Sequence, residues 1–547
     1  MTVHHVLGAR RLAAVLSLLA LAACGGSSDE GEGKGRSTDT TVSTNAITFS
    51  VPAPDAETPP AQTFTATFDD AVAHLAVIHS GNGIASVSSV VNGRTAEITV
   101  QPAAPSEIGS GIFRGTIAVT GYFCANTACS SLVAGNTEQV VVTYQISPVI
   151  LTISPYVGTA GVAGTALIRG VGFRSFPPQS VRLGEVSATE FTLISDEEIE
   201  VDYPALPVGR YPVQVEIPTH EGTLQSEAEL VIVEPTSYAA ATVAYPTSGG
   251  NVREVIYDSE RRAVFVATDQ GGGSLVRFAY GESGWDTPTQ AAVADLQDIA
   301  LSTRGEHLLA VTKSALLQID PQTLAVRKSI DPPELESTDY LRTIGVMSDD
   351  RALITTGRDK SEISPLYLYT GRRDSLTKLN TALNNATAAA TLRGSSIVFI
   401  QGITDTQTPP AIVTFTTLTG SFDGVPVYLL QNSIAPAIDL VGTRAVLNGT
   451  NVYGGGFALL GKLPATTVAV ALKPDGSRAY TYDPTAGGIL TFDVSKNNEG
   501  KDYEALGAAV PLAGNPGTNA RMTISLDGKT LFIAGPTQLV VQPTPAL

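Results

Sequence analysis

Three arginines and one aspartate, Arg253, Asp298, Arg342 and Arg521, occupy corresponding places in a repeated pattern. Each lies shortly before a turn that joins two apolar stretches. All four are therefore expected to begin the innermost strands of repeated sheets and to meet at one opening. A guanidinium group pairs bidentately with carboxylates, so these residues predict a sector that binds an anion such as a uronic acid. The structural alternative is that Asp298 pairs with the neighbouring arginines and holds adjacent repeats together.

The turns of this repeat carry the strongest signal in the chain. In Lys473-Pro474-Asp475-Gly476-Ser477, Pro presets φ and Gly accepts a positive φ between two apolar strands. The aligned turn positions are Glu260, Gly305, Asp349, Gly394, Gly442, Gly476 and Gly528. Most intervals are close to the roughly 40–45 residues of a four-stranded β-propeller blade. Seven blades are favoured, with six or eight left open because the last two intervals depart most from this period.

The repeat region, residues 235–547, is expected to close on itself. Its last blade has three strands, and an unassigned strand, Ala239 to Tyr245, precedes the first turn. We expect that strand to become the outer strand of the last blade, because unpaired sheet edges promote aggregation. Asp475 to Tyr480 and Asp527 to Phe532 resemble the repeats of YVTN-type propellers. Relatives of that fold include cell-surface proteins and a cytoplasmic sugar-phosphate lactonase.

The N-terminus has the composition of a targeting segment. Arg10 and Arg11 precede the short apolar run Leu12 to Ala22, which is too short to span a membrane. The ending Leu21-Ala22-Ala23-Cys24 resembles a bacterial lipobox, which implies a signal peptide over residues 1–23 and a palmitate-containing lipid on Cys24. The residue after Cys24 is Gly25, as in lipoproteins sent to the outer membrane. Residues 24–44 are polar and small, and predict a flexible tether.

Two segments between the tether and the repeats predict immunoglobulin-like sandwiches, because short alternating strands are separated by turns. Within residues 45–147, the runs Ser110 to Val119 and Val140 to Tyr144 resemble the end of a BACON-type domain, a family often associated with carbohydrate or mucin binding. Residues 148–234 resemble an IPT/TIG domain, a structural or binding module without a catalytic motif. Within the second segment, the run Val208 to Val215 is expected to form a hairpin.

Few other residues in the sequence suggest a chemical role. Cys124 and Cys129 flank a short turn and are expected to form a disulfide, since an exported compartment permits one. The formal net charge of −18 argues against nucleic acid as a partner, because that affinity comes largely from phosphate neutralisation. We find no nucleophile elbow, phosphate loop or metal-ligand cluster, so no catalytic residue, metal or cofactor is predicted.

These observations predict an all-β protein with two sandwiches followed by a propeller. The first functional hypothesis is a non-enzymatic lipoprotein of the outer membrane, on its periplasmic side or at the cell surface, whose propeller binds a protein or a carbohydrate. The alternatives are a hydrolase or lactonase that uses the propeller channel, and a purely structural envelope protein. An enzyme would place titratable groups with perturbed pKa values together in the channel.

Overall fold

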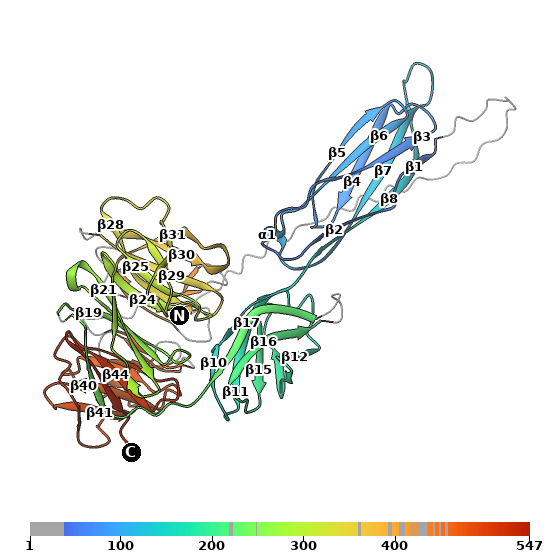
Figure 1. The fold of residues 1–547 in the computed structure, drawn as a ribbon. Helices are drawn as coiled ribbons and strands as arrows, with labels where there is room; N and C mark the ends of the chain where they lie inside the picture. Colours follow the sequence, from blue (N-terminus) through green and yellow to red (C-terminus); the bar gives the residue numbers. More distant parts are fainter. Residues whose placement is uncertain are drawn as a thin grey trace, which may run out of the picture.

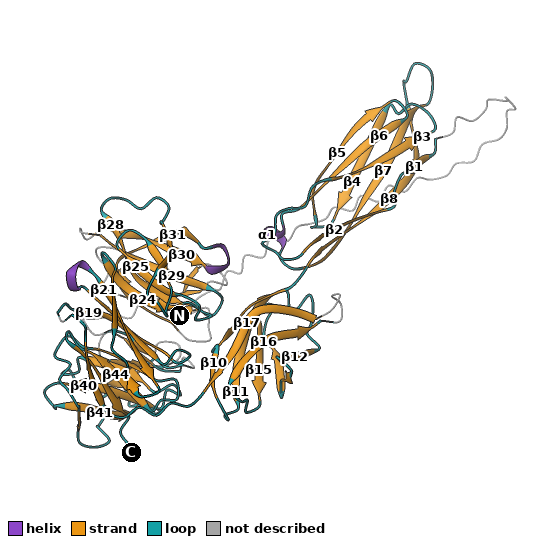
Figure 2. Ribbon diagram, viewed as in Figure 1, coloured by secondary structure: helices purple, strands orange, loops and turns teal. Residues whose placement is uncertain are grey.

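The protein is almost entirely β-structure in a computed structural model (Figures 1 and 2). The structure describes residues 38–217, 223–247, 249–358, 363–391, 397–403, 411–416, 421–423, 435–440, 443–447, 450–454 and 458–546. Within these ranges the helical elements are α1 (Pro105–Ile108) and two 3-10 turns, η1 (Gln270–Gly272) and η2 (Gly371–Arg373). No helix in the described ranges combines the length and the hydropathy needed to cross a membrane.

The N-terminal sandwich contains two four-stranded sheets, ordered β1-β3-β6-β5 and β2-β8-β7-β4. Alternate residues of strands such as β3, for example Phe64 and Phe68, are buried between the sheets. The strands are β1 (Thr40–Val42), β2 (Ala46–Val51), β3 (Gln62–Phe68), β4 (His74–Ser80), β5 (Ile84–Asn92), β6 (Thr95–Pro102), β7 (Gly111–Cys124) and β8 (Leu132–Ile146).

Strand β1 differs from the sequence-based expectation. Thr40–Val42 was assigned to the flexible tether, yet it pairs antiparallel with β3. The Asn136 side chain holds it from the other side by donating to the carbonyl oxygen of Thr40, at 3.0 Å. These contacts come from residues distant in the sequence, so the local polar composition did not reveal them.

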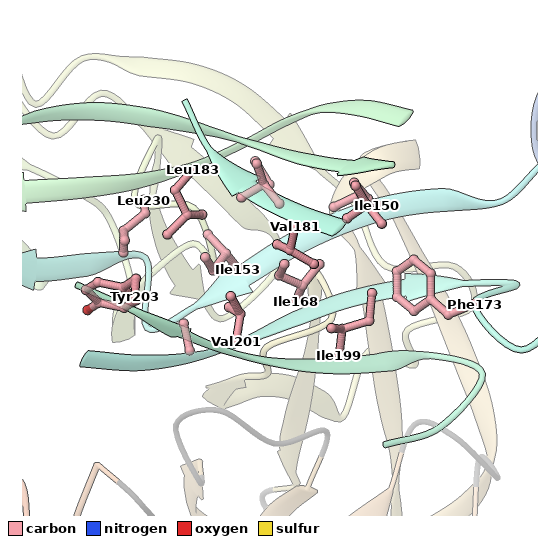
Figure 3. Close-up of a cluster of buried hydrophobic side chains, with 14 of the residues drawn as sticks. Ile150, Ile153, Ile168, Phe173, Val181, Leu183, Ile199, Val201, Tyr203 and Leu230 are labelled. Atoms are coloured by element: carbon pink, nitrogen blue, oxygen red, sulfur yellow. The ribbon is translucent and has the colours of Figure 1, made fainter. Parts of the chain in front are cut away.

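The second sandwich packs the five-stranded sheet β10-β17-β16-β12-β13 against the four-stranded sheet β14-β15-β11-β9. Figure 3 shows its core, in which Ile168, Ile199 and Val201 meet Val181 and Leu183 between the two sheets. The strands are β9 (Val149–Ser154), β10 (Val157–Thr159), β11 (Gly164–Val171), β12 (Ser180–Leu183), β13 (Val186–Ser187), β14 (Glu190–Leu193), β15 (Glu198–Tyr203), β16 (Gly209–Glu216) and β17 (Thr223–Val233).

The hairpin expected over Val208 to Val215 is wrong. Gly209 to Val215 belong to one strand, β16, which pairs with β12 on one side and β17 on the other. The chain passes Pro212 without reversing because the pairing with β17 shifts register between Pro212 and Gln214. A bulge of this kind accommodates a residue that cannot donate a ladder hydrogen bond.

The propeller follows from β18 onward. Five of its sheets each form one blade, and the seven-stranded sheet β28-β29-β30-β31-β32-β33-β34 forms two. The long strand β31 pairs with β30 through its first half and with β32 through its second half, with a register shift between Asn384 and Ala388. Among the described strands this arrangement gives the seven blades favoured by the sequence.

The closing strand is β18 (Ala241–Ala244). The strands that follow it, up to the third blade, are β19 (Val252–Asp258), β20 (Ala263–Thr268), β21 (Ser274–Gly281), β22 (Gly284–Trp285), β23 (Thr289–Ala292), β24 (Leu296–Leu301), β25 (Leu308–Thr312), β26 (Leu316–Ile319), β27 (Val326–Ile330), β28 (Asp339–Val346), β29 (Arg351–Arg358) and β30 (Ile363–Thr370). Those that follow are β31 (Ser375–Thr391), β32 (Ile397–Ile403), β33 (Ala411–Thr416), β34 (Ser421–Asp423), β35 (Ala437–Ile438), β36 (Ala445–Leu447), β37 (Asn451–Tyr453), β38 (Leu459–Lys462), β39 (Ala469–Leu472), β40 (Arg478–Asp483), β41 (Gly488–Asp493), β42 (Val510–Pro511), β43 (Arg521–Ile524), β44 (Thr530–Ala534) and β45 (Gln538–Pro543).

The propeller is a closed ring. The inner strands contact one another in the order β19, β24, β28, β31, β35, β39 and β43, and β43 contacts β19 again. As expected from the sequence, β18 is the outer strand of the last blade, pairing antiparallel with β45 from Ala241 opposite Val541 to Ala244 opposite Gln538. The first and last strands of the propeller therefore belong to one sheet.

An aromatic cluster holds this closure at the point where the chain leaves the second sandwich. Tyr238 is buried and lies 5.6 Å from Trp285 in a stacked arrangement and 5.4 Å from Phe532, measured between ring centroids. Its hydroxyl is 2.6 Å from that of Tyr257. Because Trp285 and Tyr257 belong to the first blade and Phe532 to the last, Tyr238 ties both to the linker.

The turns themselves refine the alignment of the repeat. Gly305, Gly476 and Gly528 adopt positive φ, as expected for the reversal. In the first and third blades the positive φ falls on Arg262 and Asp350, after the aligned positions Glu260 and Asp349. Gly394 and Gly442 lie outside the described residues.

Candidate functional site

The inner strands surround a channel along the axis of the propeller. It contains a cavity of about 360 Å³, lined by residues of β19, β24, β28, β35, β39 and β43. Most of the lining side chains are apolar, such as Ile299, Ile344 and Val470, and the carboxylates among them are Glu254 and Asp298. The channel has two ends. At one, the turn end, each inner strand turns into the second strand of its blade. At the other end the inner strands begin.

The second sandwich packs against the turn end, which we call the covered end. Residues Ser154 to Val157 line the same cavity as the inner strands. The Thr152 hydroxyl donates to the carbonyl oxygen of Ser348, and both residues are buried. A methyl group on Gly305 would collide with the Tyr156 ring, so the two domains touch closely at this turn. Figure 1 shows β10 and β11 of the second sandwich next to the propeller.

Ion pairs surround this contact. Arg210 pairs with Glu229 of its own domain at 3.0 Å and also with Glu260 of the first propeller turn. Arg304 of the second turn pairs with Glu227 at 3.2 Å. The N-terminal sandwich adds Asp55, whose carboxylate lies 3.2 Å from Arg372 in the β30–β31 connection. All of these contacts are on the turn side of the propeller.

The sequence-predicted residues lie at the opposite end, which we call the open end. Arg253 is the second residue of β19, Arg521 the first of β43, and Asp298 and Arg342 lie in the first halves of β24 and β28. The structure therefore brings the four residues to one opening. Arg521 Nε donates to the Arg253 carbonyl oxygen at 3.4 Å, and Arg253 lies 3.8 Å from the Asp269 carboxylate.

Bulges divide these residues into two levels. The pairing of inner strands shifts register between Val252 and Glu254, between Leu296 and Asp298, and between Leu341 and Thr343. Each shift inserts one extra residue, so Arg253, Gln297 and Arg342 form an outer rim. The corresponding residues of the next level, which we call the mouth layer, are Arg521, Glu254, Asp298, Thr343 and Ala469. Ala435 belongs to the same layer, because it stands four residues before the Asp439 amide that closes its turn, as Ala469 does before the Lys473 amide.

The mouth layer is asymmetric. Its charged residues, Arg521, Glu254 and Asp298, come from the last, first and second blades, which are neighbours in the ring. The alanines Ala435 and Ala469 come from the fifth and sixth blades. Among the positions whose side chains the structure describes, the charged groups therefore lie on the side of the last, first and second blades, and the small apolar ones on the side of the fifth and sixth.

Asp298 is a bridge between two blades. Its two carboxylate oxygens accept hydrogen bonds from the main-chain amides of Ile299, at 2.8 Å, and of Ile344 in the next blade, at 2.9 Å. Burial and then the nearby Glu254 carboxylate raise the pKa of Asp298, while the two amides and Arg521 act in the opposite direction. The partners of its carboxylate here are amides, rather than the arginines that the structural alternative proposed.

Glu254 was missed by the sequence analysis. It lies half-buried in the channel wall, and its carboxylate accepts a hydrogen bond from the Val255 amide at 2.9 Å. Burial raises the pKa of Glu254, with Val255 and Arg521 acting to lower it. The available signal was the acidic residue directly after Arg253, but the aligned turn position Glu260 precedes the residue of positive φ, Arg262, so counting back from it went one residue too far.

A second, polar hollow lies beside the covered end. It has a volume of about 150 Å³ and is lined by Arg304, His307, Asp350 and Asp374, among others, from the second and third blades. Burial raises the pKa of Asp350 to about 6, against the attraction of the Arg304 guanidinium.

The other predicted positions lie outside the channel. Cys124, at the end of β7, forms a disulfide with Cys129 across the loop that follows. Cys24 precedes the described residues. The described part of the chain has no group of three or more His, Cys, Asp or Glu side chains arranged to hold a metal ion.

Residues 148–230 match the IPT/TIG domain family. This match agrees with the immunoglobulin-like topology of the second sandwich. No curated protein matches the chain.

Solved structures resemble part of the chain. Hydrazine synthase of Kuenenia stuttgartiensis is 12% identical with a TM-score of 0.40, covering 56% of this chain and 99% of that one. The WD40 repeats of RRP9 are 11% identical with a TM-score of 0.41, covering 56% and 100%. The β-propeller domain of Cps50 (Swd1) of Myceliophteria thermophila is 8% identical with a TM-score of 0.40, also covering 56% and 100%. The all-β domains suggest a binding or scaffold role, and these distant likenesses carry no information about a ligand.

Proposed function

We propose that the chain is a non-enzymatic envelope lipoprotein, anchored through Cys24, whose propeller binds a protein or carbohydrate at its open end. The observation that supports this most is the unequal use of the two channel ends. The second sandwich packs against one, so ligand access is expected through the other. The mouth layer offers both kinds of contact that ligand sites use, a few placed polar groups and an apolar wall.

The rim favours a ligand that carries carboxylate or hydroxyl groups. Arg253 and Arg342 of the rim, and Arg521 of the mouth layer, present guanidinium groups, which bind such oxygens with directional hydrogen bonds. Glu254 and Asp298 lie in the mouth layer with Arg521, so a purely anionic ligand would meet carboxylates beyond the rim. A ligand with both hydroxyl groups and a carboxylate, such as an acidic glycan, fits this order of charges better than a simple anion.

The test uses the exported chain with Cys24→Ala, which leaves the described residues unchanged. This protein is applied to a glycan array and to extracts of cell envelopes. Arg342→Ala and Arg521→Ala should weaken binding at least tenfold, whereas Arg327→Ala on the outer strand β27 serves as the matched control. Equal binding by all three variants would contradict a site at the open end.

Membrane anchoring has a separate test. Growth with a labelled fatty acid should label the wild-type protein, and Cys24→Ala should abolish the label. An unlabelled wild-type protein would contradict the lipoprotein assignment without affecting the proposed ligand site.

A hydrolase or lactonase remains the second candidate because Glu254 and Asp298 lie together in the channel wall and burial raises the pKa of both. The two amide hydrogen bonds to Asp298 favour a structural role for that residue. Activity on ester or lactone substrates that disappears in Glu254→Gln, with ligand binding retained, would support the enzyme instead.

A further inference from the structure

The N-terminal sandwich has two unprotected edges on the same side. Strand β5 is the edge of one sheet and β4 the edge of the other, and the two strands contact each other. Neither strand contains a proline or any Asp, Glu, Lys or Arg residue. Natural proteins usually protect edge strands with such residues or by keeping the strands short. The opposite edge of the same sheet, β1, is only 3 residues long, whereas β5 has 9.

Apolar side chains are exposed along this edge. Val90 is 71% exposed and Val91 is 43% exposed, both near the end of β5, and Ile78 on β4 is 69% exposed. Consecutive residues of a strand point to opposite faces of the sheet. Exposure of both Val90 and Val91 therefore means that neither face of β5 is covered at this end.

We propose that β5 pairs antiparallel with β5 of a second copy of this chain. We choose a second copy of the chain as the partner because of the distribution of charge. The chain carries a formal net charge of −18, so two copies repel each other over most of their surfaces. The edge formed by β4 and β5 carries no acidic residue, so two copies can approach here without placing carboxylates opposite each other.

The sequence of β5 suits pairing about a twofold axis. In an antiparallel pair centred on Ser89, Val87 of each copy lies opposite Val91 of the other, and Ser89 lies opposite Ser89. Cross-strand pairs of β-branched residues stabilise a sheet. The pairing would join two four-stranded sheets into one and satisfy the outward main-chain groups of β5 in both copies.

This interface would serve a binding protein without blocking its ligand site. Figure 1 shows β5 on the N-terminal sandwich, away from the propeller. A dimer joined there presents two open channel ends, and two linked sites bind a multivalent surface more tightly than one. The proposed pairing does not depend on what the propeller binds.

The first experiment measures the mass of the exported Cys24→Ala chain by analytical ultracentrifugation from low to high concentration. A monomer–dimer equilibrium is expected, and raising the salt concentration should strengthen it by screening the repulsion. In Ser89→Lys like charges lie directly opposite each other, so the dissociation constant should rise at least tenfold. Val141→Lys is the matched control, because Val141 is 45% exposed on β8, which is paired on both sides. It should leave the equilibrium unchanged.

The second experiment tests the register. Ser89→Cys should form an intermolecular disulfide under mild oxidation, because residues on the axis have Cβ atoms close enough for one. Ser88→Cys, which would lie opposite Val90 of the other copy, should cross-link much more slowly. The proposal is overturned by a chain that stays monomeric at about 100 μM, a concentration well above a micromolar Kd, and whose Ser89→Cys variant does not cross-link. Protection of the β5 amides only when a different protein is added also overturns it.

Discussion

The two ends of the propeller channel use different kinds of contact. The covered end is held by contacts between domains: the buried Thr152 and Ser348, the packing of Tyr156 on Gly305, and a surrounding set of ion pairs. At the open end, Glu254, Asp298 and Arg521 hydrogen-bond to main-chain groups and Arg253 lies beside Asp269, all within the propeller. This comparison distinguishes the contacts that hold the domains together from the side chains proposed to contact a ligand.

The largest effect is expected at the covered end, from Tyr238→Ala. Removing a buried aromatic ring from between the first and last blades should lower the free energy of unfolding by about 3–5 kcal/mol. Tyr238→Phe is the control, because it keeps the ring and removes only the hydrogen bond to Tyr257, worth about 1 kcal/mol. Chemical denaturation measures both. Similar losses in the two variants would show that the hydroxyl pair, rather than packing, stabilises the closure.

A pair of equivalent glycines separates the contact between domains from backbone strain. Gly305 and Gly528 both adopt positive φ, but an added methyl group would collide with the Tyr156 ring at Gly305, whereas at Gly528 it would lie 3.1 Å from the Lys473 and Pro474 side chains of the propeller itself. Both alanine variants should lose roughly 1 kcal/mol from strain, and Gly305→Ala should lose a further 1–3 kcal/mol from overpacking. Limited proteolysis of the linker around Glu234 should accelerate in Gly305→Ala alone. Equal behaviour would mean that the second sandwich does not pack tightly on this turn.

Asp350, beside the covered end, predicts a dependence on pH. Its pKa is raised to about 6 in the folded protein, above the ordinary 3.8. The folded state therefore favours the protonated Asp350 carboxyl. The stability that this protonation provides is fully present below about pH 4 and is lost as the pH rises through about 6. Asp350→Asn should raise the free energy of unfolding at pH 8 by roughly 1–3 kcal/mol and should have little effect at pH 4. A destabilised variant at pH 8 would show that the ionised carboxylate is favourable.

The smallest effect is expected for Arg210→Ala. Arg210 pairs with Glu229 and Glu260, but its side chain is 57% exposed. An exposed ion pair contributes only about 0–1 kcal/mol and is weakened by salt. Denaturation at low and high salt checks this. A loss above about 2 kcal/mol would mean that charge, more than packing, holds the second sandwich on the propeller.

The sequence predicted the parts of the fold that depend on local pattern. The Asp-Gly turns and their period predicted the blades, and the spare strand Ala239 to Tyr245 predicted the closure. The site was only partly predictable, because the first and third turns lack the glycine that marks the others. Their aligned positions, Glu260 and Asp349, precede the residues of positive φ, Arg262 and Asp350. Counting back from them therefore reached Arg253 and Arg342, one residue early. The contact of Thr152 with Ser348 joins residues that are far apart in the chain, so no local sequence pattern predicts it.

The central claim is that one channel end is covered by the second sandwich while the other is open. Two single-cysteine variants in the Cys24→Ala chain test it, with the Cys124–Cys129 disulfide retained: Arg253→Cys at the open rim and Ser259→Cys in the cavity wall at the covered end. Their rates of reaction with a bulky maleimide are compared with those of the unfolded variants. We predict that the thiol of Arg253→Cys reacts nearly as fast as in the unfolded chain and that of Ser259→Cys at least tenfold more slowly. Equal rates for the two folded variants would contradict the account.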